Sequence, residues 1–160
     1  MKLTINNKTS VVLSFLLKKS LIVFLLFAVS FTFIAVAAPL ESGLVNWLKT
    51  LILPLICLTY YTIDILKYSQ KTYFETQDNG INIHSGNLTK NNQLNLLYSQ
   101  IKSMNISQPF RFKIFGICSI SVFHSDGLMT SAWGFNLKEA KEFIDLTSKN
   151  FKIEFHSSTN

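Results

Sequence analysis

Two long apolar stretches near the start of the chain constrain its fold more than any other feature. They are Leu21–Leu40, which carries no charge, and Leu44–Ile63, which contains a single lysine, Lys49. A helix needs about 20 mostly apolar residues to cross a hydrocarbon core of roughly 30 Å. The two stretches therefore predict a transmembrane helical hairpin over residues 20–66, with a turn at Pro39–Gly43.

The charges that flank these stretches predict an orientation. Residues 1–19 contain four lysines and no acidic residue, and Lys67 and Lys71 closely follow the second stretch. Positive charge near helix ends stays on the cytoplasmic side of a membrane. The sequence therefore predicts a multi-pass protein of the cell membrane with both termini cytoplasmic, a lipid bilayer as its first partner, and residues 1–19 as a cytoplasmic N-terminal segment.

A cleaved signal peptide is the alternative interpretation of the first stretch. Lys18 and Lys19 precede an apolar run that ends in the small residues around Ala37 and Ala38. This resembles a basic region, an apolar region and a cleavage site, although the apolar run is longer than the usual 7–15 residues. Cleavage within Leu21–Ala38 stays an open alternative, in which the second stretch alone would anchor the chain.

Residues 67–155 follow a different pattern and are expected to form one domain, with residues 156–160 as a tail. Asp78–Gly80 and Ser125–Gly127 are typical turns of β-hairpins. Alternating apolar residues between such turns predict strands. The seven predicted strands are Tyr73–Gln77, Gly80–Ser85, Gln93–Leu97, Ile101–Ser107, Phe110–Ile114, Ile117–His124 and Leu128–Trp133.

The alternation also predicts which side chains face the core. Phe112 and Ile120 are expected to be buried, whereas Arg111 is expected to face solvent. Ile101 is out of phase with the apolar residues that follow it, which predicts a bulge one or two residues later.

After these strands the apolar period changes to that of a helix, from Leu137 onward. Asn136 is a good N-cap residue, and Glu139 follows it at the spacing of a capping box. One amphipathic C-terminal helix after seven antiparallel strands is the pattern of a pleckstrin-homology-like barrel. The predicted fold class is therefore α+β, with a transmembrane hairpin before the barrel.

Four segments carry a resemblance to a known family. They read GINIHSG, LLYSQIKS, GICSISV and GFNLKEAKEF, at Gly80–Gly86, Leu96–Ser103, Gly116–Val122 and Gly134–Phe143. With the two preceding apolar stretches, the layout resembles the bacterial two-span membrane proteins that have a pleckstrin-homology-like domain, a mostly uncharacterised group. The resemblance implies that fold.

The side chains that usually carry chemistry are scattered along the sequence. Cys57 and Cys118 do not have the spacing of a metal or redox pair, so both are expected to be structural. His84 and His124 are expected to lie opposite the core face and to be solvated. No phosphate loop or nucleophile motif is found. The sequence therefore predicts no catalytic residue, no metal site, no cofactor and no enzyme.

One basic group is a candidate binding site. Lys102, Arg111 and Lys113 are expected to face away from the core and to contact anionic lipid head groups, at about 1 kcal/mol per residue. A plain solvated face is the alternative for these residues. Nucleic acid is not an expected partner, because the excess of basic charge lies mostly beside the apolar stretches.

The predicted function is that of a non-enzymatic integral membrane protein whose domain acts as a protein-interaction or membrane-surface module. The partner protein would be an unidentified membrane or cytoplasmic protein. The alternative is a subunit or assembly factor of a larger membrane complex that acts through its transmembrane hairpin.

Overall fold

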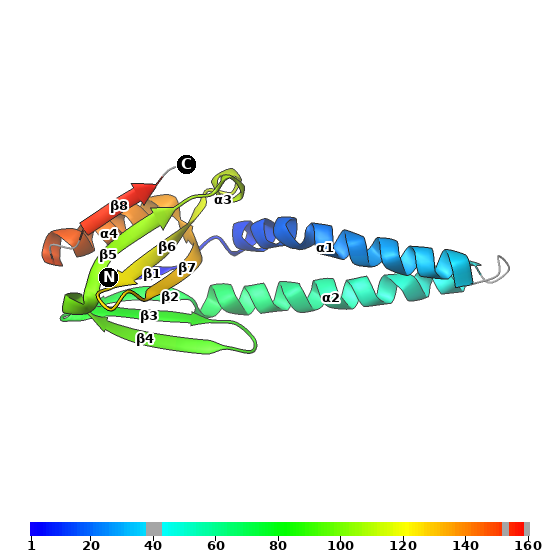
Figure 1. The fold of residues 1–160 in the computed structure, drawn as a ribbon, viewed down its shortest axis with the longest axis horizontal. Coiled ribbons are helices and arrows are strands. Elements are labelled where there is room, and N and C mark those ends of the chain that lie inside the picture. Colours follow the sequence, from blue (N-terminus) through cyan, green and yellow to red (C-terminus); the bar gives the residue numbers. More distant parts are fainter. Residues whose placement is uncertain (38–42, 152–153, 159–160) are drawn as a thin grey trace.

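In the computed structural model the chain forms two β-sheets, from which a pair of long helices projects (Figure 1). The structure describes residues 1–37, 43–151 and 154–158. In chain order their elements are β1 (Lys2–Thr4), α1 (Lys8–Ala37), α2 (Gly43–Lys71), β2 (Tyr73–Gln77), β3 (Gly80–Gly86), β4 (Asn91–Leu97), the 3₁₀ turn η2 (Tyr98–Gln100), β5 (Ile101–Ser107), α3 (Phe110–Ile114), β6 (Ile117–His124), β7 (Met129–Asn136), α4 (Leu137–Phe151) and β8 (Glu154–Ser158).

The described strands form two sheets of four strands each. The first sheet has the order β1-β2-β3-β4, and all its neighbours are antiparallel. The second has the order β7-β6-β5-β8, in which β8 runs parallel to β5. Both predicted glycine turns join antiparallel neighbours, β2 to β3 and β6 to β7, and are confirmed. At Gly80 a Cβ atom would lie 2.1 Å from the carbonyl oxygen of Leu96, so the residue must be glycine.

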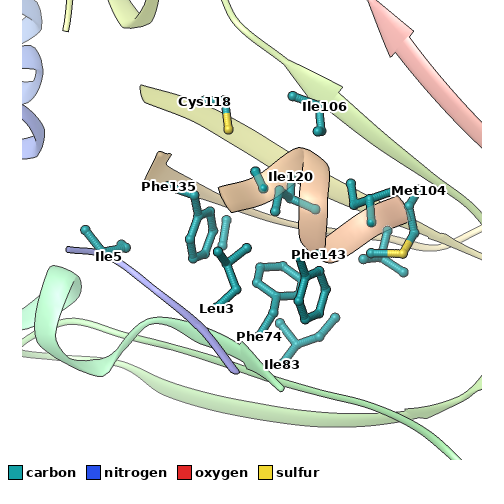
Figure 2. Packing of buried hydrophobic residues seen from close by; sticks show 14 of the residues in the cluster. Leu3, Ile5, Phe74, Ile83, Met104, Ile106, Cys118, Ile120, Phe135 and Phe143 are labelled. Atoms are coloured by element: carbon teal, nitrogen blue, oxygen red, sulfur yellow. The ribbon is translucent and has the colours of Figure 1, made fainter. Parts of the chain in front are cut away.

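The apolar core fills the space between the two sheets, and α4 packs into it (Figure 2). Phe74 of β2 makes edge-on ring contacts with Phe135 of β7 and Phe143 of α4, at centroid distances of 5.3 and 6.2 Å. Leu3 of β1 and Val11 of α1 belong to the same core. The start of the chain is therefore built into the fold, and each sheet covers the apolar face of the other.

The predicted transmembrane hairpin is wrong. α1 and α2 form at the expected places and lie side by side (Figure 1), but no helix within residues 1–37, 43–151 and 154–158 is long and apolar enough to cross a membrane. Lys49 and Thr50 interrupt the apolar sequence of α2, and the last residues of the first stretch, with most of the predicted turn Pro39–Gly43, lie outside the described residues. The predicted location as a multi-pass protein of the cell membrane is wrong on the same finding.

The predicted seven-stranded antiparallel barrel is also corrected in detail. Phe110–Ile114 is the short helix α3 instead of a strand, and β1 and β8 were not predicted. Two predictions on local structure are confirmed. The register of β5 shifts between Ile101 and Ser103, which is the expected bulge, and the Asn136 carboxamide oxygen accepts the backbone N–H of Lys138 at 2.9 Å, as an N-cap does.

Candidate interaction site around α3

The short helix α3 forms where β5 leaves its sheet. Pro109 precedes the helix, and its carbonyl oxygen accepts the backbone N–H groups of Phe112 and Lys113 at 2.8 and 3.1 Å. Proline suits this position because its fixed φ angle is compatible with a helix start. Gly116 has a φ of 65° and ends the segment, since glycine adopts this left-handed conformation without strain. The sequence therefore confines α3 to five residues.

The two faces of α3 have opposite environments. Phe112 is 5% exposed, as predicted, whereas Phe110 and Ile114 are 78% and 59% exposed. Residues four apart lie on the same helix face, so Phe110 and Ile114 form one outward apolar surface, beside which Lys113 is exposed. The expectation that Arg111 faces solvent is not met, because the residue is half-buried. Its guanidinium carbon lies 4.9 Å from the centre of the Phe112 ring, within cation–π range. We call Phe110, Arg111, Lys113 and Ile114 the α3 face.

The buried side of α3 packs against a stack of aromatic rings. The ring of Trp133 in β7 stacks on Phe112 of α3, Tyr68 of α2 and Phe15 of α1, at centroid distances of 5.5, 5.2 and 6.3 Å and interplanar angles of 12°, 21° and 10°. Aromatic pairs of this kind contribute about 0.5–1.5 kcal/mol beyond the burial of their area. The stack therefore joins α1, α2 and α3 to the same strand.

Trp133 and Tyr68 are also joined by hydrogen bonds, at a point where the pairing of β6 with β7 is irregular. The register shifts between Cys118 and Ser119, opposite Gly134, whose φ is 100°. The backbone N–H of Trp133 donates to the Tyr68 hydroxyl at 2.9 Å, and that hydroxyl donates to the Trp133 carbonyl oxygen at 3.2 Å. Burial raises the pKa of Tyr68 to about 12, although the hydrogen bond with the Trp133 backbone acts in the opposite direction. The phenol therefore stays protonated and completes the ladder.

The structure divides the three predicted lipid-contact residues into two groups. Arg111 and Lys113 lie together on α3, which follows the end of β5. Lys102 is exposed at the start of β5, beside Ile101, which pairs with His124. The length of β5 therefore separates Lys102 from the other two cations (Figure 1).

The side chains with chemical reactivity form no second site. No three His, Cys, Asp or Glu side chains of residues 1–37, 43–151 and 154–158 are grouped closely enough to hold a metal ion. Cys118 is buried, and burial raises the pKa of its thiol to about 12, which disfavours the reactive thiolate. The expectation that His124 is solvated is wrong. It is buried, and its Nε2 lies 3.0 Å from the Thr130 hydroxyl oxygen.

Sequence reasoning missed the contribution of α1 and α2 to this site. Phe15 and Tyr68 lie in or beside the two apolar stretches, and their partner Trp133 is 118 and 65 positions away in the chain. No local period indicates such contacts. The positive φ of Gly134 is the one feature with a visible cause in the sequence, because glycine in a strand often marks a bulge.

Comparison with known proteins identifies the family. The family model for the bacterial PH domain matches residues 12–151, which include most of α1, all of α2, strands β2 to β7, and α4. No curated protein matches the chain. The match confirms the pleckstrin-homology-like part of the resemblance found in the sequence, whereas its two membrane spans are not supported. Domains of this type are typically interaction modules for proteins or lipids without catalytic activity. The chain belongs to the bacterial PH domain family.

Proposed function

We propose that this chain is a non-enzymatic interaction module that attaches reversibly to anionic lipid surfaces through the α3 face. The observation that supports the proposal is the composition of that face. Phe110 and Ile114 are exposed large apolar side chains, and Arg111 and Lys113 are cations on the same five-residue helix. Exposed apolar side chains beside positive charge are the combination that binds the interface of a membrane with anionic lipids.

The expected affinity of the α3 face is modest. Each cation near an anionic surface contributes about 1 kcal/mol, and full burial of a Phe or Ile side chain contributes about 1.5–3 kcal/mol. Insertion that is only partial gives less than the sum of these terms. The attachment is therefore weak and reversible, and it depends on salt because the charges are screened over about 10 Å at 0.1 M.

The rigid support of α3 favours this function. The Phe112 ring stacks on the Trp133 ring and holds the backbone of α3 in place. The helix therefore loses little conformational freedom when its exposed residues meet a surface. A preformed helix binds with less entropic cost than a flexible loop. Arg111 has no acidic partner within the described part of the chain, so its charge is not compensated there.

Sedimentation with vesicles tests the proposal. The purified full chain is mixed with vesicles of phosphatidylcholine and with vesicles that contain one-fifth phosphatidylserine. We expect more protein to sediment with the anionic vesicles at low salt, and this difference to disappear in Arg111→Gln/Lys113→Gln. Lys102→Gln is the matched control, because it removes one cation at the other end of β5 and should retain the difference.

Two results would contradict the proposal. The first is equal sedimentation of the unmodified chain with both kinds of vesicle at low salt, because the charge of the α3 face would then have no effect. The second is a loss in Lys102→Gln as large as that in the double variant, because net charge alone would then explain the binding.

A further inference from the structure

A cavity lies between α1, α3 and β7, and Arg111 of the α3 face is one of its lining residues. Its volume is about 230 Å³, and it is lined by Ser14, Phe15, Arg111, Phe112 and Trp133. A water molecule in the liquid occupies about 30 Å³, so the cavity has room for a small organic molecule. Its walls come from α1, α3 and β7, three elements that are distant in sequence.

The hydroxyl of Ser14 is an unsatisfied donor in this cavity. Ser14 is 1% exposed, and its Oγ has no hydrogen-bond partner among the residues that the structure describes. Hydroxyl groups in helices usually donate to the carbonyl four residues earlier. Thr32, Thr59 and Thr62 of α1 and α2 do so, at 2.7–2.8 Å, but Ser14 does not. A buried hydroxyl without a partner is costly, and an acceptor atom of a ligand in the cavity would remove this cost.

Arg111 supplies a positive charge at the same cavity. The residue is half-buried, its guanidinium lies over the Phe112 ring, and no carboxylate within residues 1–37, 43–151 and 154–158 forms an ion pair with it. The planar guanidinium offers several N–H donors in a fixed arrangement that matches a carboxylate. Arg111 and Ser14 therefore offer two side-chain donors at the cavity, one charged and one neutral.

The remaining walls are aromatic. Phe15, Phe112 and Trp133 contribute rings, and the Trp133 ring is nearly parallel to the other two. Ligand cavities commonly combine apolar walls with a few polar groups that fix the orientation of the ligand. From these four observations we infer that the cavity binds a small organic anion, a carboxylate whose body is flat or short and apolar. The carboxylate oxygens accept from Arg111 and Ser14, and the apolar body lies against the rings.

This site and the lipid attachment proposed above overlap at Arg111 alone. Lipid attachment uses the exposed Phe110, Ile114 and Lys113, none of which lines the cavity. Arg111 is shared by both, but Ser14 belongs to the cavity alone. A substitution at Ser14 and one at Lys113 therefore separate the two proposals.

Tryptophan fluorescence measures the predicted binding. The chain has two tryptophans, so Trp47→Phe leaves Trp133, a wall of the cavity, as the single fluorophore. This variant of the full chain is titrated with benzoate, with benzyl alcohol, which keeps the ring without the charge, and with inorganic phosphate, which keeps the charge without the ring. We expect a saturable change in Trp133 fluorescence with benzoate. Benzyl alcohol and phosphate should bind at least about tenfold more weakly, because the first lacks the charge and the second lacks the ring.

Further variants assign the binding to named side chains. In the Trp47→Phe background, Ser14→Ala should weaken benzoate binding about three- to tenfold and Arg111→Gln at least about tenfold. Arg111→Lys keeps the charge and should bind more tightly than Arg111→Gln. Lys113→Gln is the control and should stay within about twofold. Thermal unfolding of each variant verifies that it is folded.

Three results would overturn the inference. They are the absence of a saturable change with benzoate, equal affinity for benzoate and benzyl alcohol, and unchanged affinity in both Ser14→Ala and Arg111→Gln. The last result would place any binding outside this cavity.

Discussion

The two ends of strand β6 both expose large apolar side chains, but they differ in charge and in support. At the α3 end Phe110 and Ile114 are exposed beside Arg111 and Lys113. At the other end Leu128 and Met129 are exposed at 64% and 55%, beside the acidic Asp126. The Asp126 carboxylate accepts the backbone N–H of Leu128 at 3.0 Å and so belongs to the turn itself. Exposed apolar side chains are therefore common to both ends, whereas the α3 end combines them with positive charge and the other end with negative charge.

Support from the rest of the fold is the second difference. The α3 end rests on the Trp133 stack, which includes side chains of α1 and α2. The turn at the other end is held by backbone hydrogen bonds, from the His124 N–H to the Leu128 carbonyl oxygen and from the Ser125 N–H to the Gln100 carbonyl oxygen, both at 2.8 Å. The α3 end is therefore a junction of distant segments, and its stability should respond strongly to substitution.

The largest expected effect compares two phenylalanines of α3. Phe112→Ala should lower the free energy of unfolding by about 3–5 kcal/mol, because it removes a buried ring from the Trp133 stack. Phe110→Ala should change it by less than about 0.5 kcal/mol, because that ring is exposed. Urea unfolding of the two variants measures the difference. Similar losses in both would mean that α3 does not have the two distinct faces described above.

The next effect concerns the close approach of α1 to β7. Gly134 has a positive φ, and a Cβ atom there would lie 2.9 Å from Val11 Cγ2. Gly134→Ala should therefore cost about 2–4 kcal/mol, from backbone strain and from overpacking. Gly127→Ala is the matched control, because its φ is also positive but no atom lies within 4 Å; it should cost about 1–2 kcal/mol. Equal costs in urea unfolding would remove the Val11 contact from the explanation.

A smaller effect is expected at Tyr68. Tyr68→Phe leaves the buried N–H of Trp133 without its acceptor, which should cost about 1–3 kcal/mol. Tyr60→Phe, at an exposed position of the same helix, should be nearly neutral. A loss in Tyr60→Phe equal to that in Tyr68→Phe would show that the hydrogen bonds with Trp133 are not the cause.

The raised pKa of Tyr68 adds a dependence on pH. Its pKa rises from 10.0 to about 12 on folding, so between these values the unfolded chain loses the proton that the folded chain keeps. The free energy of unfolding should therefore fall as the pH rises from 10 to 12. The contribution of Tyr68 to this free energy should be fully present below pH 10. Tyr68→Phe should make this decline shallower. An unchanged decline would indicate that other groups, such as the buried Cys118 thiol, cause it.

The smallest effect is expected at the other end of β6. Leu128→Ser should change the free energy of unfolding by less than about 0.5 kcal/mol, because the side chain is exposed. Its sedimentation with anionic vesicles should equal that of the unmodified chain, whereas Phe110→Ser should sediment less. Loss of vesicle binding in Leu128→Ser would extend the binding surface to the turn and weaken the contrast between the two ends.

Local signals in the sequence predicted the parts of the fold that depend on neighbouring residues. The turns at Asp78–Gly80 and Ser125–Gly127, the bulge after Ile101 and the N-cap at Asn136 each follow from two to four adjacent residues. The burial of Phe112 and Ile120 followed from alternation. For Phe112 the result was right although the element was not, because a five-residue segment fits both a strand and one turn of helix.

Contacts between distant segments could not be predicted in the same way. β1 has only three residues, and it forms because Leu3 packs in the core while its backbone pairs with β2. The Trp133 stack joins four elements, and no period in the sequence relates them. The two apolar stretches did predict helices, but the inference that these helices cross a membrane was wrong. Arg111 and Lys113 lie on the same short helix, although they were expected on one face of a strand, whereas Lys102 lies at the other end of β5.

Fluorescence from an environment-sensitive dye tests the central proposal, lipid attachment through α3, most directly. The dye is attached to a cysteine introduced at Phe110 or, as the comparison, at Leu128, in a Cys57→Ser background; Cys118 is buried and should not react. With vesicles that contain phosphatidylserine, we predict a blue shift and brighter emission for the dye at position 110, none at position 128, and loss of the shift at high salt. An equal shift at both positions, or a shift at position 128 alone, would contradict the proposal that the α3 face meets the lipid.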